Sequence, residues 1–263
     1  MEILIKKYLD LGIDKVIDHD RFNSISIVHH STALEGSTLT EVETGVLINE
    51  GLTPKGKPLY HSLMVEDHFK ALEFVINAAD KKRPISIELI QKIAGKVLKR
   101  TGSVYHTVFG EIDAGKGEFR KGNVTAGQTY FPNYDKVESL MNGLVERVMS
   151  KMESDLTVQE KLNLSFDAHF NLVSIHPFYD GNGRTSRLLM NYIQRFYKLP
   201  LAIVHSESKS EYIQALIDTR EKDDIHVFRS FMQSEYVRQL ESEIEKYNSI
   251  IEPKKGRGFH FMF

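Results

Sequence analysis

One twelve-residue segment, running from position 176 to 187 and reading HPFYDGNGRTSR, gathers residue types suited to chemistry on a phosphorylated ligand. Gly181 and Gly183 allow unusual backbone dihedral angles and let the backbone approach a ligand closely. They stand directly before an expected helix, whose first N–H groups are unpaired and lie at the positive end of the helix dipole. The segment therefore predicts an anion-binding loop at the start of a helix.

Two arginines follow this loop. Arg184 and Arg187 are three residues apart, so both guanidinium groups should emerge on one face of the expected helix, which Asn191 continues. Two guanidinium groups beside a cradle of N–H groups fit a ligand with several phosphates better than a single carboxylate. Apolar residues of the same helix should lie opposite and anchor it in the core: Leu188, Leu189, Tyr192, Ile193 and Phe196.

Asp180 and His176 complete the chemistry of the segment. A carboxylate at position 180 would repel phosphates unless a divalent cation lay between them, and magnesium held by one carboxylate plus phosphate oxygens satisfies that condition. The imidazole of His176 can accept a proton near neutral pH. Together these residues predict a phosphoryl- or nucleotidyl-transfer site in which His176 activates a hydroxyl nucleophile.

The elements that must position these residues are mostly helices. Apolar residues recur at helical spacing over 63–76, 85–98, 162–175, 188–196, 212–217 and 227–244. The exception is 101–135, where glycines separate short runs of Val, Thr, Tyr and Phe, with strands expected near 117–120 and 123–131. The expected fold class is mostly α, a helical bundle with an inserted β-hairpin.

A further helix is expected over 23–36, ending at a glycine. Glu35 falls on the same side of this helix as the apolar Ile25 and Val28. A carboxylate near a helix C-terminus is disfavoured by the helix dipole unless it is paired, and one on an inward face needs a cation. The chain offers Arg187 as that cation.

Composition excludes several classes of protein. The 34 Lys and Arg residues against 36 Asp and Glu residues give a net charge of −2, so no overall basic footprint for nucleic acid is present. The absence of Cys excludes disulfides and thiolate chemistry, and no H-E-x-x-H pair suggests zinc. No long apolar run predicts a membrane span, and the N-terminus is a poor signal peptide. We expect a soluble, cytoplasmic protein.

The segment 176–187 matches the signature H-P-F-x-[DE]-G-N-G-R-x-x-R of the Fic family at every fixed position, and the region 60–235 resembles a Fic core. Members of this family mostly transfer AMP from ATP to a Ser, Thr or Tyr hydroxyl of a target protein. The resemblance implies His176 as the base and Asp180 as the magnesium ligand. It also implies Gly181-Asn182-Gly183 as the anion hole, Arg184 on the β-phosphate side and Arg187 near the γ-phosphate.

Two weaker resemblances concern the target and the adenine ring. Residues 117–120, GEFR, followed by Val124 and Phe131, resemble the Fic flap that holds an extended segment of the target by strand-like pairing, and Arg120, Val124 and Phe131 are the expected docking residues. A glycine-rich hairpin without such a role is the alternative. Tyr212 matches a family position that lines the adenine pocket, with an ordinary core tyrosine as the alternative.

Ser31 and Glu35, followed by glycine, are similar to the Fic inhibitory motif [ST]-x-x-x-E-[GN], placed ahead of the core as in the class with an N-terminal inhibitory helix. The resemblance implies that Glu35 pairs with Arg187 and keeps the γ-phosphate from its productive place. The expected domains are a helical region at 1–60 with the inhibitory helix at about 22–36, a Fic core at 61–240 with the flap at about 117–132, and an extension at 241–263.

The expected activity is protein adenylyltransfer with ATP and Mg²⁺, inhibited by Glu35. Removal of AMP, a bifunctional enzyme and a non-catalytic regulatory module stay open as alternatives, whereas Gly183 argues against a phosphorylating variant, which carries Lys there. The expected partner is a target protein presenting a hydroxyl side chain, and a homodimer is left open. The last eleven residues, PKKGRGFHFMF, are expected to dock on their own domain, with strand pairing to a partner as the alternative.

Overall fold

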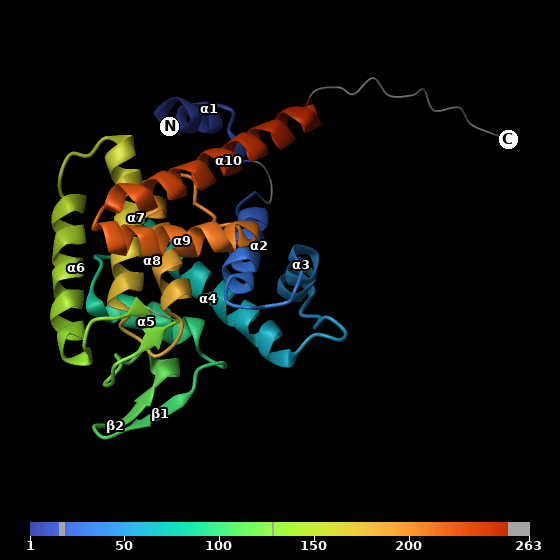
Figure 1. Ribbon diagram of the computed structural model, residues 1–263. Coiled ribbons are helices and arrows are strands. Elements are labelled where there is room, and N and C mark those ends of the chain that lie inside the picture. The colour runs from blue at the N-terminus through green and yellow to red at the C-terminus, as the bar shows by residue number, and fades with distance from the viewer. Residues whose placement is uncertain (16–18, 128, 252–263) are drawn as a thin grey trace.

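The computed structural model describes residues 1–15, 19–127 and 129–251 of the chain, so the expected C-terminal tail lies outside the described residues. The fold is mostly α, as predicted, and the helices at 158–175 and 182–196 are its central helices (Figure 1). The helices are α1 (Glu2–Asp10), α2 (His19–Ala33), α3 (Glu41–Glu50), α4 (Leu59–Asp80), α5 (Ile87–Val97), α6 (Val137–Met152), α7 (Val158–Ile175), α8 (Asn182–Phe196), α9 (Lys209–Lys222) and α10 (Ile225–Ile251).

Helix α8 lies at the centre, with α7 along one side and α4 along another (Figure 1). Four of its five predicted anchors are buried (Leu188, Leu189, Tyr192 and Ile193), Phe196 is partly buried, and the polar residues Asn191 and Gln194 are buried as well. Asn191 donates to the carbonyl of Ala202, and Gln194 donates to Ser165 Oγ, so these buried amides have partners. A helix buried over most of its length holds its side chains rigidly, which suits a helix that carries a functional site.

Two apolar clusters hold the bundle together. The first joins α2, through Ile27 and Val28, to α4, α5, α6, α7 and α8. The second lies around α1, α9 and α10, and it buries Phe166 and Met190 from the central helices. Helix α2 therefore shares its core with the central helices. The division of the chain into domains at 60 and 240 stays a prediction.

Capping side chains define the first residues of two helices, α7 and α3. Thr157 accepts a hydrogen bond from the backbone N–H of Glu160, whose carboxylate accepts one from the N–H of Thr157. Thr40 and Glu43 form the same reciprocal capping box at the start of α3. This pattern, Thr followed three residues later by Glu, satisfies two otherwise unpaired N–H groups at each helix start.

The β region differs in detail from the prediction. The strand expected near 117–120 is absent, because the N–H of Arg120 donates to Pro177 O of the loop after α7, and Gly117 adopts a left-handed φ of 72°. The segment expected as one strand at 123–131 forms a small hairpin of β3 (Thr125–Ala126) and β4 (Thr129–Tyr130). A second hairpin, of β1 (Val104–Thr107) and β2 (Gly110–Asp113), extends from the bundle below α5 (Figure 1).

Candidate active site

The loop between α7 and α8 begins at His176, which closes α7 in the left-handed conformation with φ 53° and ψ 57°. A residue with a β-carbon is strained there, and such strain is concentrated at functional sites. The imidazole Nδ1 lies 3.3 Å from the carbonyl of Val173, so Nδ1 carries the hydrogen and Nε2 keeps its lone pair. Burial lowers the pKa of His176 to about 4, so the ring is neutral and ready to accept a proton at neutral pH.

Asn182 gives this loop its shape. Its side chain accepts a hydrogen bond from the N–H of Phe178 and donates one to the carbonyl of the same residue, at 3.0 and 2.9 Å. Gly181 has φ 76° and serves as the N-cap of α8. The Asn182 amide thus lies inside the loop and holds it closed at the start of α8.

Arg184 is a buried cation with unused donors. The residue is 1% exposed, and its Nε and Nη1 atoms have no hydrogen-bond partner among the described residues. Its Nη2 lies 3.5 Å from both carboxylate oxygens of Asp180, a distance at the limit for a hydrogen bond. A buried guanidinium with two unpaired nitrogens is costly, so this arrangement suits a site that receives an anion.

Arg187 is also buried, but its donors are occupied by residues from near the end of α2. Its Nε donates to Ser31 Oγ at 2.8 Å, and its Nη2 donates to the Ser31 carbonyl at 2.9 Å and to Glu35 Oε1 at 2.7 Å. Burial alone would lower the pKa of Arg187, but Glu35 holds it above the usual value. Burial opposes the charge of Glu35 as well, and Arg187 and Arg184 hold the pKa of that carboxyl below its usual value.

Gly183 brings the Glu35 carboxylate into the cradle. A β-carbon at position 183 would lie 2.5 Å from Glu35 Oε1 and 3.1 Å from Arg187 Nη1, so only glycine leaves room for an anion at this point. The carboxylate therefore lies directly over the first turn of α8, where the sequence predicts a phosphate. The predicted pair of Glu35 with Arg187 is present, although α2 ends at Ala33 and Glu35 follows it in a turn.

The flap residues are placed in different ways. Arg120 is 2% exposed, and its guanidinium donates to the carbonyls of His176, Gly122 and Pro132, so it ties the flap from within to the loop that begins at His176. Phe131 stacks on the imidazole of His176, with ring centroids 3.8 Å apart and planes 17° from parallel. Val124 is half-buried. Arg120 was expected to dock the target, but its side chain is buried and binds the protein's own backbone. Docking of the target by Val124 and Phe131 stays a prediction.

Tyr212 lies in the core and is 3% exposed. Its hydroxyl is 2.8 Å from His169 Nε2. Its expected contact with adenine stays a prediction. Neither the Tyr212 hydroxyl contact nor His169 was predicted, because residues 43 positions apart show no joint signal in a sequence periodicity.

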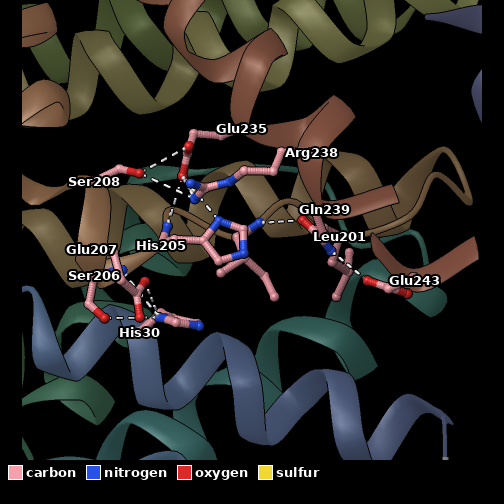
Figure 2. A network of polar contacts seen from close by, with 11 residues as sticks. His30, Leu201, His205, Ser206, Glu207, Ser208, Glu235, Arg238, Gln239 and Glu243 are labelled. Carbon is pink, nitrogen blue, oxygen red and sulfur yellow. Dashed lines mark hydrogen bonds and ion pairs between the residues drawn. The ribbon is translucent and has the colours of Figure 1, made fainter. Parts of the chain in front are cut away.

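A polar network docks α2 beside the start of α9 (Figure 2). His30 Nδ1 accepts a hydrogen bond from the backbone N–H of Ser206 at 3.1 Å, and its ring lies against that of His205, with centroids 4.9 Å apart. Burial first, and then His205 and His29, lower the pKa of His30 to about 4, against the opposing charges of Glu207 and Glu41. The neutral ring is required here, because a protonated Nδ1 could not accept from Ser206.

The described residues hold no group of three His, Cys, Asp or Glu side chains that could bind a metal ion by themselves. They also include no helix long and apolar enough to cross a membrane.

Comparison with known proteins places this site in a family. Residues 84–194 match the Fic/DOC family. Over 197 residues, 74% of this chain, the sequence is 30% identical to "Protein adenylyltransferase Fic" from Drosophila willistoni, and equally so to the protein of that name from Drosophila melanogaster. The match covers only 37% of the length of each of these relatives.

Solved structures agree with this assignment. A Fic domain containing signaling protein from Bacteroides thetaiotaomicron superimposes with a TM-score of 0.80 at 26% identity, covering 94% of this chain and 97% of that one. Fic-1 from C. elegans shares the fold, with a TM-score of 0.72 at 22% identity over 95% of this chain and 73% of that one. The loop at 176–187 lies within the matched residues 84–194, and the bundle superimposes on a Fic domain structure, so the chain carries the Fic domain of the Fic/DOC family.

Proposed function

We propose that this protein is an adenylyltransferase that moves AMP from ATP to a hydroxyl side chain of a target protein and is inhibited by its own Glu35. The observation that carries the proposal is the anion cradle over Gly183, flanked by two buried arginines and beside a neutral histidine. The name of the Drosophila relatives supports the same activity.

His176 is the base in this proposal. The target hydroxyl oxygen attacks the α-phosphorus of ATP, its proton passes to His176 Nε2, and the bond from the α-phosphorus to the bridging oxygen breaks, releasing pyrophosphate. The Nδ1–H contact with the Val173 carbonyl keeps Nε2 unprotonated before the step. Because its pKa is about 4, the neutral form of the ring predominates at physiological pH.

Arg184, Arg187 and the first turn of α8 bind the phosphates. The unpaired Nε and Nη1 of Arg184 supply donors that the protein itself leaves unused. The charge that develops on the departing pyrophosphate would be stabilised by these fixed donors, which need no reorganisation during the reaction.

Asp180 fits the usual way in which proteins bind magnesium, which does not need a complete cage of protein ligands. It is a single carboxylate beside the cradle, with 42% of its side chain exposed, and Mg²⁺ commonly binds through one carboxylate together with substrate phosphates. When bound, the ion neutralises charge on the phosphate oxygens. The 3.5 Å contacts between Asp180 and Arg184 are weak enough to be exchanged for such a ligand.

Glu35 competes for the position that a terminal phosphate would take. Its carboxylate lies where a phosphate oxygen would bind both the N-terminus of α8 and Arg187. We infer that the protein belongs to the class with an N-terminal inhibitory helix and that it acts slowly until Glu35 is displaced.

The test uses ATP labelled on either the α- or the γ-phosphate, with Mg²⁺ and the Glu35→Gly protein. Protein-bound label from the α-phosphate alone, lost on His176→Ala, is the expected result. Label from the γ-phosphate would mean phosphorylation and refute the proposal. Absence of both labels, combined with release of AMP from a pre-modified protein, would favour the AMP-removing alternative.

A further inference from the structure

The β1–β2 hairpin touches the loop between α7 and α8 through a pair of tyrosines. Tyr105 of β1 stacks on Tyr179 of the loop, with ring centroids 4.4 Å apart and planes 25° from parallel. Tyr105 pairs across the hairpin with Ile112 of β2, which is 2% exposed. Since residues paired across two strands lie on one face, the Tyr105 ring lies on the inner face of the hairpin. The hairpin therefore packs against the residue that directly precedes Asp180.

A second contact holds Tyr179 from the flap. A β-carbon at position 122 would lie 2.8 Å from Tyr179 Oη, so the hydroxyl reaches the flap backbone only because Gly122 has no side chain. Gly122 is itself fixed, because its carbonyl accepts a hydrogen bond from Arg120 Nη1 at 2.8 Å. Tyr179 is thus held on its ring face by Tyr105 and at its hydroxyl by Gly122, and we call these three residues the tyrosine clamp.

The contacts of the Asp180 carboxylate do not by themselves fix its place. Its Oδ1 accepts a hydrogen bond from the N–H of Gly181, the next residue, at 2.5 Å. Both oxygens lie 3.5 Å from Arg184 Nη2, at the limit for a hydrogen bond. A bond to the adjacent residue moves with the loop, so the place of the carboxylate depends on the backbone at 179–180. The clamp anchors that backbone through the Tyr179 ring.

We propose that Tyr105 and Tyr179 are positioning residues, which together with Gly122 hold the Asp180 carboxylate where it can share a magnesium ion with the phosphates of ATP. This inference rests on the proposed function. Magnesium tolerates little distortion of its ligand geometry, so a carboxylate that shares it with phosphate oxygens must be held in place. Loss of the clamp would reduce what the ion adds to ATP binding and leave the phosphate contacts of the arginines unchanged.

The experiment measures ATP binding to the Glu35→Gly protein by calorimetry, once with excess Mg²⁺ and once with EDTA, and compares the ratio of the two affinities. Tyr105→Ala should lower this ratio about two- to tenfold, the range that one aromatic pair contributes, without changing the affinity in EDTA. Tyr105→Phe keeps the ring and should retain the ratio. Phe109→Ala is the matched control, because it removes an aromatic contact of the same hairpin that joins Tyr134 instead of the loop. Its ratio should equal that of the parent.

A pair of substitutions tests the flap side of the clamp. Gly122→Ala places a methyl group against the Tyr179 hydroxyl and should lower the same ratio. Tyr179→Phe removes that hydroxyl and keeps the stacked ring, and the nearest ring carbon is then 3.8 Å from the added methyl group. Gly122→Ala should therefore have no effect in the Tyr179→Phe protein. Thermal unfolding followed by circular dichroism verifies that each variant is folded.

Four results would overturn the inference: an unchanged ratio in Tyr105→Ala, an equal loss of ATP affinity with and without Mg²⁺ in that variant, an equal effect of Gly122→Ala with Tyr or Phe at position 179, or a parent protein that binds ATP equally with and without the ion. Failure of the proposed function looks different. A parent protein whose ATP binding responds to Mg²⁺ but which transfers no AMP would refute adenylyltransfer, and the ratios would still decide on the clamp.

Discussion

Substituting Glu35 by glycine tests the central contact of the site. The change removes one charge-assisted hydrogen bond, from Arg187 Nη2 to Glu35 Oε1 at 2.7 Å, and empties the space over Gly183. Ser31 still binds Arg187 through its hydroxyl and its carbonyl, so the guanidinium stays near its place. The perturbation is thus local to the position proposed for the terminal phosphate.

The magnitude follows from the bond that is lost. A hydrogen bond to a charged group contributes about 1.5–3 kcal/mol. Since about 1.4 kcal/mol corresponds to a factor of ten, releasing this competitor should raise the rate of AMP transfer by about 10- to 100-fold. Glu35→Gln keeps an uncharged acceptor of similar shape, whose bond is about half as strong, so its increase should be about three- to tenfold.

The assay measures protein-bound α-phosphate label at saturating ATP and Mg²⁺, for wild type, Glu35→Gln and Glu35→Gly. Thermal unfolding followed by circular dichroism verifies that all three are folded, and His176→Ala in the Glu35→Gly protein gives the background. We expect the rate of AMP transfer to increase from wild type to Glu35→Gln and from Glu35→Gln to Glu35→Gly. Equal rates for wild type and Gly would refute competition at the cradle, and equal rates for Gln and Gly would show that the charge of Glu35 contributes nothing.

Three further predictions concern the pH, the cradle and the flap. The docked His30 has a pKa of about 4, whereas a free imidazole has one of about 6.5, so a fall in pH through this range favours the protonated, undocked ring. The rate of transfer by the wild type should therefore rise relative to that of Glu35→Gly between pH 7 and 5, where His176 is still neutral. A constant ratio of the two rates, or an unchanged slope of that ratio in His30→Gln, would contradict this. Gly183→Ala in the Glu35→Gly protein should lower the rate of AMP transfer by about tenfold or more, because the methyl group enters the space 3.1 Å from Arg187 Nη1. Steady-state kinetics with ATP measure this, and an unchanged kcat/KM would contradict it. Arg120→Met leaves three carbonyls without their donor and should lower the free energy of unfolding by about 3 kcal/mol in urea denaturation; a loss below about 1 kcal/mol would mean that water replaces the guanidinium.

Much of the site could be predicted from local sequence. Gly181 and Gly183 were expected before a helix and lie at its N-cap and in its first turn, where they form the predicted cradle. Two arginines three residues apart must share a face of that helix, because this consequence depends only on backbone geometry within one turn. The pairing of Glu35 with Arg187 was predicted across 152 positions, because an inward carboxylate near a helix end requires a cation and the resemblance to the Fic inhibitory motif implied Arg187.

Other features were decided by tertiary structure alone. The flap segment that carries Arg120 was expected to form a strand, but its N–H bonds to Pro177 and its guanidinium to three carbonyls of the flap and the catalytic loop. Stacking of Phe131 on His176 and the bond from Tyr212 to His169 likewise join segments that only the folded bundle brings together. Helical and strand periodicity report which face of an element is buried, but not which distant side chain it meets there. The sequence therefore determined the residue types of the loop, and contacts between segments distant in the sequence decided which residues hold it in position.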